Sequence, residues 1–186
     1  ELEGIDFNVG RGELLSLVGP NGAGKTTLMR CLSDGGERSG GTIRINDHDA
    51  GRLPPHRIVG FGIGRKFQTA NAFDTLTVAE SLRIARTRLV RPRFFARESA
   101  LALPKAALQV IRATGLDAVL HVEAKHLSHG MKQALELAMV LSLEPSVLLL
   151  DEPTAGLTKP ERTLIGGILT DLVRDHGLCI LLVEHD

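Results

Sequence analysis

The chain has 186 residues, and its 22 basic and 22 acidic side chains give a formal net charge of zero. That length suits one α/β domain with a sizeable core, and the balanced charge provides no bulk field to attract nucleic acid or anionic lipid. No apolar run approaches the roughly 20 residues of a membrane-spanning helix. Neither Cys31 nor Cys179 belongs to a Cys-x-x-Cys pair, so we expect two reduced core residues in the cytoplasm.

Strand signals dominate the first third of the chain. We expect strands at residues 5–9, 14–18, 42–45 and 62–67. The short run 14–18 is apolar except for Ser16 and predicts a buried strand. Ile5, Phe7 and Val9 alternate with polar residues and predict a half-exposed strand. After the buried run come a glycine-rich loop and, from Thr27, the first turns of a helix.

Helical signals dominate the remainder. We expect helices at residues 100–113, 128–143 and 160–175, one more that starts near residue 77, and buried strands at 147–150 and 178–183. Thr77 and Glu80 form a capping-box pattern, and Ser128 is a typical helix N-cap. Pro160 suits the first turn of its helix. Because strands alternate with helices, we expect an α/β fold with a parallel sheet.

Residues 77–135 interrupt this alternation, because their helices have no strand between them. We therefore expect a single domain over residues 1–186, with a core at 1–76 and 136–186 and an inserted helical subdomain at 77–135. An arginine cluster lies in the insert beside Phe94 and Phe95: Arg83, Arg86, Arg88, Arg91, Arg93 and Arg97. A solvated helix face is the first interpretation and a partner-protein or membrane-proximal contact the second. Nucleic acid is the third, which no recognisable module supports.

The glycine-rich loop fits the pattern Gly-x-x-x-x-Gly-Lys-Thr of a phosphate-binding loop. It consists of Gly19, Pro20, Asn21, Gly22, Ala23, Gly24, Lys25 and Thr26. Its glycines let successive backbone N–H groups form a concave anion nest, and the following helix adds the positive end of its dipole. Lys25 would reach the β- and γ-phosphates of a nucleotide, and the Thr26 hydroxyl would hold Mg²⁺. We therefore expect the core at residues 1–76 and 136–186 to bind a nucleotide.

Two acids follow the expected strand at 147–150. Ligands of open parallel sheets bind at the carboxyl ends of the strands, where Lys25, Asp151, Glu152 and His185 all fall. Asp151 can hold Mg²⁺, usually through a water. Glu152 would then be the general base that polarises the attacking water.

A third motif, Leu-Ser-His-Gly-Met at residues 127–131, stands at a helix start. Together these motifs resemble the nucleotide-binding subunit of an ATP-binding cassette (ABC) transporter, whose signature is Leu-Ser-Gly-Gly-Gln. His129 replaces the first signature glycine and Met131 replaces the glutamine. Gln68 resembles the Q-loop glutamine, which ligates Mg²⁺ and senses the permease, and His185 resembles the switch histidine, which contacts the γ-phosphate. Residues 155–158 resemble the D-loop, with Thr158 where the family usually has aspartate, so the resemblance covers the whole chain.

The resemblance implies a P-loop NTPase with a RecA-like parallel sheet core, an antiparallel β subdomain and the helical insert. It implies a Mg²⁺-dependent ATPase that binds ATP on residues 19–26, Thr27 and Gln68. Two subunits, identical or different, would pair so that each ATP lies between Lys25 of one and Ser128, His129 and Gly130 of the other. Permease subunits would be further partners, a periplasmic or extracellular solute-binding protein an indirect one, and nucleic acid none. The subunit would lie peripherally at the cytoplasmic face of the membrane.

Residues 62–68 and 76–78 resemble the group that serves branched-chain amino acid, amide and urea uptake. His129, Lys132-Gln133 and Thr158 resemble the urea-uptake subunit more than the branched-chain amino acid one, so urea or a related amide is the expected solute. The first alternative is the ATPase of a branched-chain amino acid importer. The others are a soluble ABC ATPase acting in DNA repair or on ribosomes, and a nucleotide-dependent module that does not hydrolyse ATP, which Met131 and Thr158 favour. We also expect a chain that is incomplete at both ends. No aromatic residue suited to stack on adenine precedes the phosphate-binding loop, and the chain stops just beyond His185, where the resembled family continues with more sheet and helix.

Overall fold

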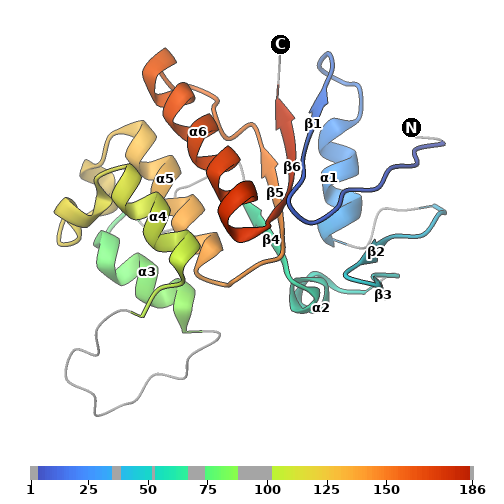
Figure 1. Cartoon of the computed structure of the whole chain (residues 1–186), viewed down its shortest axis with the longest axis horizontal. Helices are drawn as coiled ribbons and strands as arrows, with labels where there is room; N and C mark the ends of the chain where they lie inside the picture. The colour runs from blue at the N-terminus through green and yellow to red at the C-terminus, as the bar shows by residue number, and fades with distance from the viewer. Residues whose placement is uncertain (1–3, 35–38, 52, 67–73, 88–101, 185–186) are drawn as a thin grey trace. The chain divides into compact units, whose positions relative to one another are not determined.

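The structure is a computed structural model that describes residues 4–34, 39–51, 53–66, 74–87 and 102–184. Figure 1 shows its helices and strands. The chain divides into two compact units: Glu1–Gln68, Pro145–Pro153 and Thr170–Asp186 form the first, and Thr69–Glu144 and Thr154–Leu169 form the second. None of the helices in the described ranges has the length and apolar character needed to span a bilayer.

A parallel sheet of four strands, in the order β1-β6-β5-β4, is the centre of the first unit. The strands are β1 (Leu14–Val18), β4 (Ile63–Lys66), β5 (Val147–Asp151) and β6 (Cys179–Glu184). Leu149 and Leu181 pack on one face with Met29 of helix α1 (Lys25–Asp34). Leu148 and Leu150 alternate with Leu149, so they lie on the opposite face, and they are equally buried. The continuous apolar sequence of β5 follows from burial on both faces, and the predicted α/β class is confirmed.

An antiparallel hairpin of β2 (Arg44–Ile45) and β3 (His48–Asp49) accompanies this sheet. Asn46 and Asp47 have φ of +47° and +65°, the left-handed conformation of a two-residue type I′ turn. The strand expected at 42–45 is thus confirmed for its last two residues. Helix α2 (Pro55–Ile58) and the 3₁₀ turn Val59–Phe61 then lead through Gly62 into β4.

Two predictions about exposure and pairing in this unit are wrong. Leu14 and Val18 of β1 are 40% and 61% exposed, because β6 is the only neighbour that β1 has among the described strands. Residues 5–9 form no strand, since alternation identifies a face but not a pairing partner. Cys31 is half-buried, whereas Cys179 lies in the core as expected.

Helices make up the second unit: α3 (Val78–Arg86), α4 (Lys105–Ala113), α5 (His129–Leu141) and the first part of α6 (Lys159–His176), with 3₁₀ turns at Leu116–Val119 and Ala124–His126. Helix α5 packs against α3 and α4. The predicted capping box of α3 is confirmed, because the Glu80 amide donates to the Thr77 hydroxyl and the Thr77 amide donates to the Glu80 carboxylate. Helix α4 begins at Lys105 rather than at residue 100, since Pro104 disfavours helix in the residue before it.

Candidate functional site

The phosphate-binding loop joins β1 to the N-terminus of α1. Gly22 and Gly24 have φ of +83° and +87°, a conformation that residues with a side chain rarely adopt. The Ala23 amide donates to the Pro20 carbonyl oxygen at 3.2 Å, which closes a tight turn within the loop. The loop therefore enters the helix in the way that leaves backbone N–H groups available to an anion.

Lys25 folds back over this loop. Its Nζ donates to the carbonyl oxygen of Gly19 and, at 3.2 Å, to that of Pro20. Lys25 itself is half-buried, whereas Thr26 and Thr27 are exposed. The ammonium is thus held beside the glycine turn, where a phosphate group would meet a positive charge together with the loop amides.

Asp151 and Glu152 leave the sheet at the level of this loop. Asp151, which is 4% exposed, pairs in register with Val183 of β6, and Val183 pairs with Leu17 of β1 on its other side. Glu152 has φ of +50°, and its amide donates to the Val183 carbonyl oxygen at 2.9 Å. A left-handed residue other than glycine costs on the order of 1–2 kcal/mol, and such residues cluster at functional sites.

The remaining candidates of the nucleotide site, Gln68 and His185, lie outside the described residues. The strands before them, β4 and β6, end at Lys66 and Glu184, on the same edge of the sheet as the phosphate-binding loop. The oxygen donors of Thr26 and Asp151 are of the type that Mg²⁺ prefers. Together with the left-handed glycines and Lys25, this donor set fits a nucleotide with its magnesium ion.

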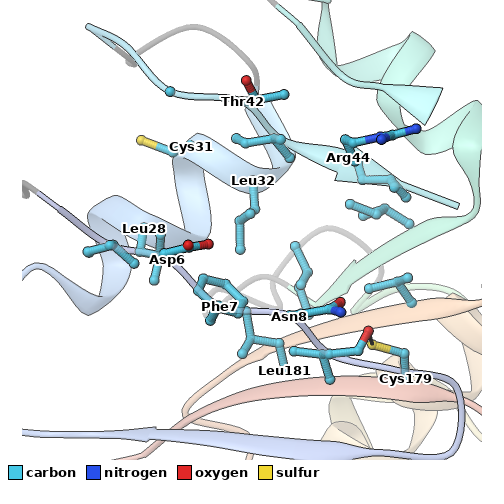
Figure 2. Close-up of a pocket in the computed structure, with 18 of the residues that line it drawn as sticks. Asp6, Phe7, Asn8, Leu28, Cys31, Leu32, Thr42, Arg44, Cys179 and Leu181 are labelled. Atoms are coloured by element: carbon cyan, nitrogen blue, oxygen red, sulfur yellow. Dashed lines mark hydrogen bonds between the residues drawn. The ribbon is translucent and has the colours of Figure 1, made fainter. Parts of the chain in front are cut away.

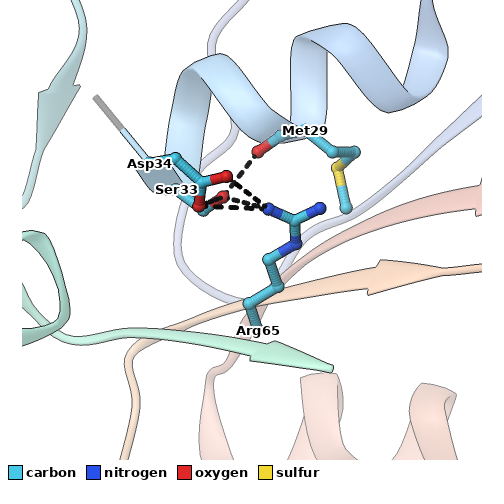
Figure 3. Close-up of polar contacts among 4 residues, drawn as sticks. All are labelled: Met29, Ser33, Asp34 and Arg65. Atoms are coloured by element: carbon cyan, nitrogen blue, oxygen red, sulfur yellow. Dashed lines mark hydrogen bonds and ion pairs between the residues drawn. The ribbon is translucent and has the colours of Figure 1, made fainter. Parts of the chain in front are cut away.

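A polar cluster fixes the C-terminal end of α1, which begins in the phosphate-binding loop. Arg65 of β4 donates to the Ser33 hydroxyl and, at 3.3 Å, to the Asp34 carboxylate, while Ser33 donates to the Met29 carbonyl oxygen at 3.0 Å (Figure 3). The cluster ties α1 to the sheet and so helps to place the loop. Sequence reasoning noted Arg65 only within a string that resembles the family.

The candidate signature loop, residues 127–131, belongs to the second unit. Ser128 caps α5 as predicted, because its hydroxyl accepts from the Met131 amide at 3.2 Å. His129 Nε2 lies 3.2 Å from the Ala155 carbonyl oxygen, to which its N–H tautomer donates. A β-carbon on Gly156 would come within 3.1 Å of the same nitrogen. The histidine that replaces the family's glycine therefore joins the candidate signature loop to the candidate D-loop, residues 155–158.

Glu161 is a participant that sequence reasoning missed. Its carboxylate accepts from the Thr158 amide at 2.9 Å and from the Thr158 hydroxyl at 2.7 Å. It also lies against Gly130, where an added β-carbon would collide with Oε1. The Thr158 bonds first, and then His129 and the Gly130 backbone, hold the pKa of Glu161 below its usual value. The pattern Thr158-x-x-Glu161 was the available signal, because it has the spacing of a capping box.

Arg86 is the one member of the arginine cluster with a clear structural role among the described residues. It donates to the Ser142 carbonyl oxygen at 2.8 Å and forms an ion pair of 2.6 Å with Glu144. Arg83 is exposed, and the other four arginines, together with Phe94 and Phe95, lie outside the described residues. Arg86 therefore stabilises the helical unit instead of contributing to a solvated face.

A cavity of about 610 Å³ in the first unit is distinct from these groups. Leu28, Cys31 and Leu32 of α1 and Cys179 and Leu181 of β6 contribute to its wall, beside residues 4–9 (Figure 2). Residues 19–27, Asp151 and Glu152 do not line it. Both cysteines are free, and burial raises the pKa of the Cys179 thiol.

The parallel sheet with a glycine loop and two acids at its carboxyl edge defines a nucleotide-binding protein of the P-loop class. The ABC transporter family matches residues 2–155, and the chain belongs to this family as an ABC ATPase domain that binds ATP. Individual members of the family are similar to this chain in sequence and in structure.

Two curated relatives are high-affinity branched-chain amino acid transport ATP-binding proteins. LivG of Escherichia coli strain K12 is 36% identical over 183 residues, which cover 94% of this chain and 71% of LivG. BraF of Pseudomonas aeruginosa is 32% identical over 193 residues, covering 100% of this chain and 76% of BraF. Among solved structures, cbiO1 from Clostridium perfringens, part of the ABC transporter complex cbiONQ, has a TM-score of 0.82 at 28% sequence identity. The match covers 100% of this chain and 72% of the cbiO1 chain. The fold expected from the motifs is thereby confirmed.

Proposed function

We propose that this protein is the ATP-hydrolysing subunit of an ABC importer, held at the cytoplasmic face of the membrane by permease subunits. One observation carries the proposal: the phosphate-binding loop and the pair Asp151 and Glu152 follow strands that end in register at the same edge of the sheet. Family membership and the transport function named for LivG and BraF support transport rather than another use of ATP.

Each residue group has one task in this mechanism. The backbone N–H groups of residues 19–27, apart from Pro20, and the Lys25 ammonium bind and orient the phosphates. Thr26 and Asp151, together with Gln68, are the proposed ligands of Mg²⁺, which when bound neutralises charge on the phosphate oxygens. Glu152 accepts the proton of the attacking water. His185 hydrogen-bonds the γ-phosphate and fixes its orientation.

Pairing of two subunits completes the site. Ser128, His129 and Gly130 stand at the N-terminus of α5, whose amides and dipole favour an anion. In the proposed dimer these residues close over the γ-phosphate held by the partner's loop, so ATP joins the subunits and hydrolysis releases them. The partner subunit is the same chain or a related one, and a solute-binding protein delivers the solute to the permease.

Branched-chain amino acids are the first solutes to test, because LivG and BraF carry that function in their names. Urea is the second, favoured by His129, Lys132-Gln133 and Thr158, which resemble a urea-uptake subunit. The test is uptake by proteoliposomes that contain the protein with its permease and solute receptor. ATP-dependent entry of labelled leucine or of labelled urea would identify the solute.

The same vesicles test the proposal itself. We expect ATP hydrolysis that rises with solute-loaded receptor and is lost in Glu152→Gln. ATP hydrolysis that is insensitive to receptor and permease, with copurifying DNA or ribosomes, would contradict the importer and support a soluble ABC ATPase instead. Binding of ATP with no turnover in the complete complex would support a module that does not hydrolyse ATP.

A further inference from the structure

One carboxylate joins the start of α5 to the start of α6 within the second unit. The Oε2 atom of Glu161 accepts from both the amide and the hydroxyl of Thr158, while Oε1 lies against Gly130. From the same loop, His129 reaches back to the Ala155 carbonyl oxygen at 3.2 Å. Two contacts of different chemistry therefore connect residues 128–130 with residues 155–161.

A second capping box in this unit shows what capping alone requires. Glu80 accepts from the Thr77 amide at 2.8 Å and from the Thr77 hydroxyl at 2.7 Å, nearly the same geometry as Glu161. The pKa of Glu80 is lowered by the bonds from Thr77 and by Arg83, which belongs to its own helix. Glu161 differs because its Oε1 atom also lies against Gly130, which belongs to another helix, and the Gly130 backbone helps to lower the pKa of Glu161. Capping of α6 does not explain this additional contact.

We propose that the Glu161 carboxylate occupies the anion-binding amide of the candidate signature loop when no phosphate is bound there, and thereby opposes ATP-driven pairing of two subunits. This inference rests on the proposed function, in which Gly130 of one copy meets the γ-phosphate bound to the other. Both groups are anionic and require the same N–H group at the N-terminus of α5. Pairing therefore displaces Oε1 from Gly130, while Oε2 can keep its bonds to Thr158.

The variant that isolates this effect is Glu161→Gln. Glutamine keeps the oxygen that a capping box needs and removes the negative charge. Glu80→Gln is the matched control, because it makes the same change in a capping box without a second helix. Both changes are introduced into the full chain carrying Glu152→Gln, and dimerisation is followed by sedimentation at increasing ATP. We expect Glu161→Gln to lower the dimer Kd by about two- to fivefold, and Glu80→Gln to leave it unchanged.

Three results would count against the proposed role of Glu161. A dimer Kd in Glu161→Gln that equals or exceeds that of Glu80→Gln, at equal Tm, would overturn the inference and leave the proposed function intact. Absence of ATP-dependent dimers in every variant would overturn the proposed function and the inference with it. A nucleotide-free measurement tests the contact itself: the amide resonance of Gly130 should move in Glu161→Gln and stay in place in Glu80→Gln, and an unmoved resonance in both would refute the contact.

Discussion

The backbone amide of Glu152 donates a hydrogen bond of 2.9 Å to the carbonyl oxygen of Val183. Val183 lies on β6, the strand between β5 and β1, so this bond ties the candidate base to the strand beside the phosphate-binding loop. The chain turns at Glu152 through a left-handed conformation, with φ of +50°. Its position beside the loop is therefore maintained against a local conformational cost.

This backbone conformation can be tested separately from chemistry. Because glycine adopts positive φ freely, Glu152→Gly should be more stable than Glu152→Ala, by about 0.5–1 kcal/mol in urea unfolding. The same pair at Arg162, in the interior of α6, should show the opposite order, since glycine is a poor helix former. An alanine variant at 152 that is as stable as the glycine variant would contradict a strained turn.

Lys25 should contribute to nucleotide affinity far more than to folding. Lys25→Ala removes a charged donor from the phosphates, so we expect a rise of roughly 10- to 100-fold in the Kd for ATP, measured by calorimetry. The change in Tm should be small, because Lys25 donates only to the Gly19 and Pro20 carbonyl oxygens in the described structure. Lys105→Ala, at the start of α4, is the control and should bind ATP normally.

Gly62 has two reasons to be glycine. Its φ is +92°, and a β-carbon there would lie 2.6 Å from the Ser146 hydroxyl oxygen. Gly62→Ala should therefore lose about 2 kcal/mol or more of the free energy of unfolding. Gly60→Ala, where an added β-carbon meets nothing within 4 Å, should change it by less than about 0.5 kcal/mol. Equal losses at the two positions would refute the close approach at Ser146.

The two cysteines should react with a thiol reagent at different rates. Cys179 is 6% exposed and burial raises the pKa of its thiol, so its reactive thiolate is scarce at neutral pH. Cys31 is only half-buried and should be labelled first by a maleimide, as read by mass spectrometry. Cys31→Ser should remove the fast phase. Fast labelling that persists in Cys31→Ser would place the reactive thiol at Cys179 and contradict its burial.

Much of the fold follows from local signals in the sequence. The apolar runs of β5 and β6 indicate burial on both faces, and the hydroxyl caps at Thr77 and Ser128 set the starts of α3 and α5. Such signals act over a few residues and need no knowledge of the tertiary structure. The phosphate-binding loop can also be predicted from the sequence, because phosphate binding requires its glycines, lysine and threonine at fixed spacing.

The features that could not be predicted depend on contacts between distant segments. The exposure of β1 follows from strand order. Residues 5–9 form no strand because no segment among the described residues pairs with them. The contact of Glu161 with Gly130 joins two helices, and Arg65 joins β4 to α1. The left-handed turn at Glu152 is imposed by the bond to Val183, which no pattern around residue 152 specifies.

The proposed mechanism requires that Glu152 activates water at a site where the phosphate-binding loop holds ATP. Its most direct test is Glu152→Gln, with ATP turnover and ATP affinity measured on the same preparation and Asp117→Asn as the charge-matched control. We expect turnover to fall by at least about 100-fold, while the Kd for ATP is unchanged and ATP traps a dimer. Turnover that stays at the level of the Asp117→Asn control would show that Glu152 is not the group that activates the water.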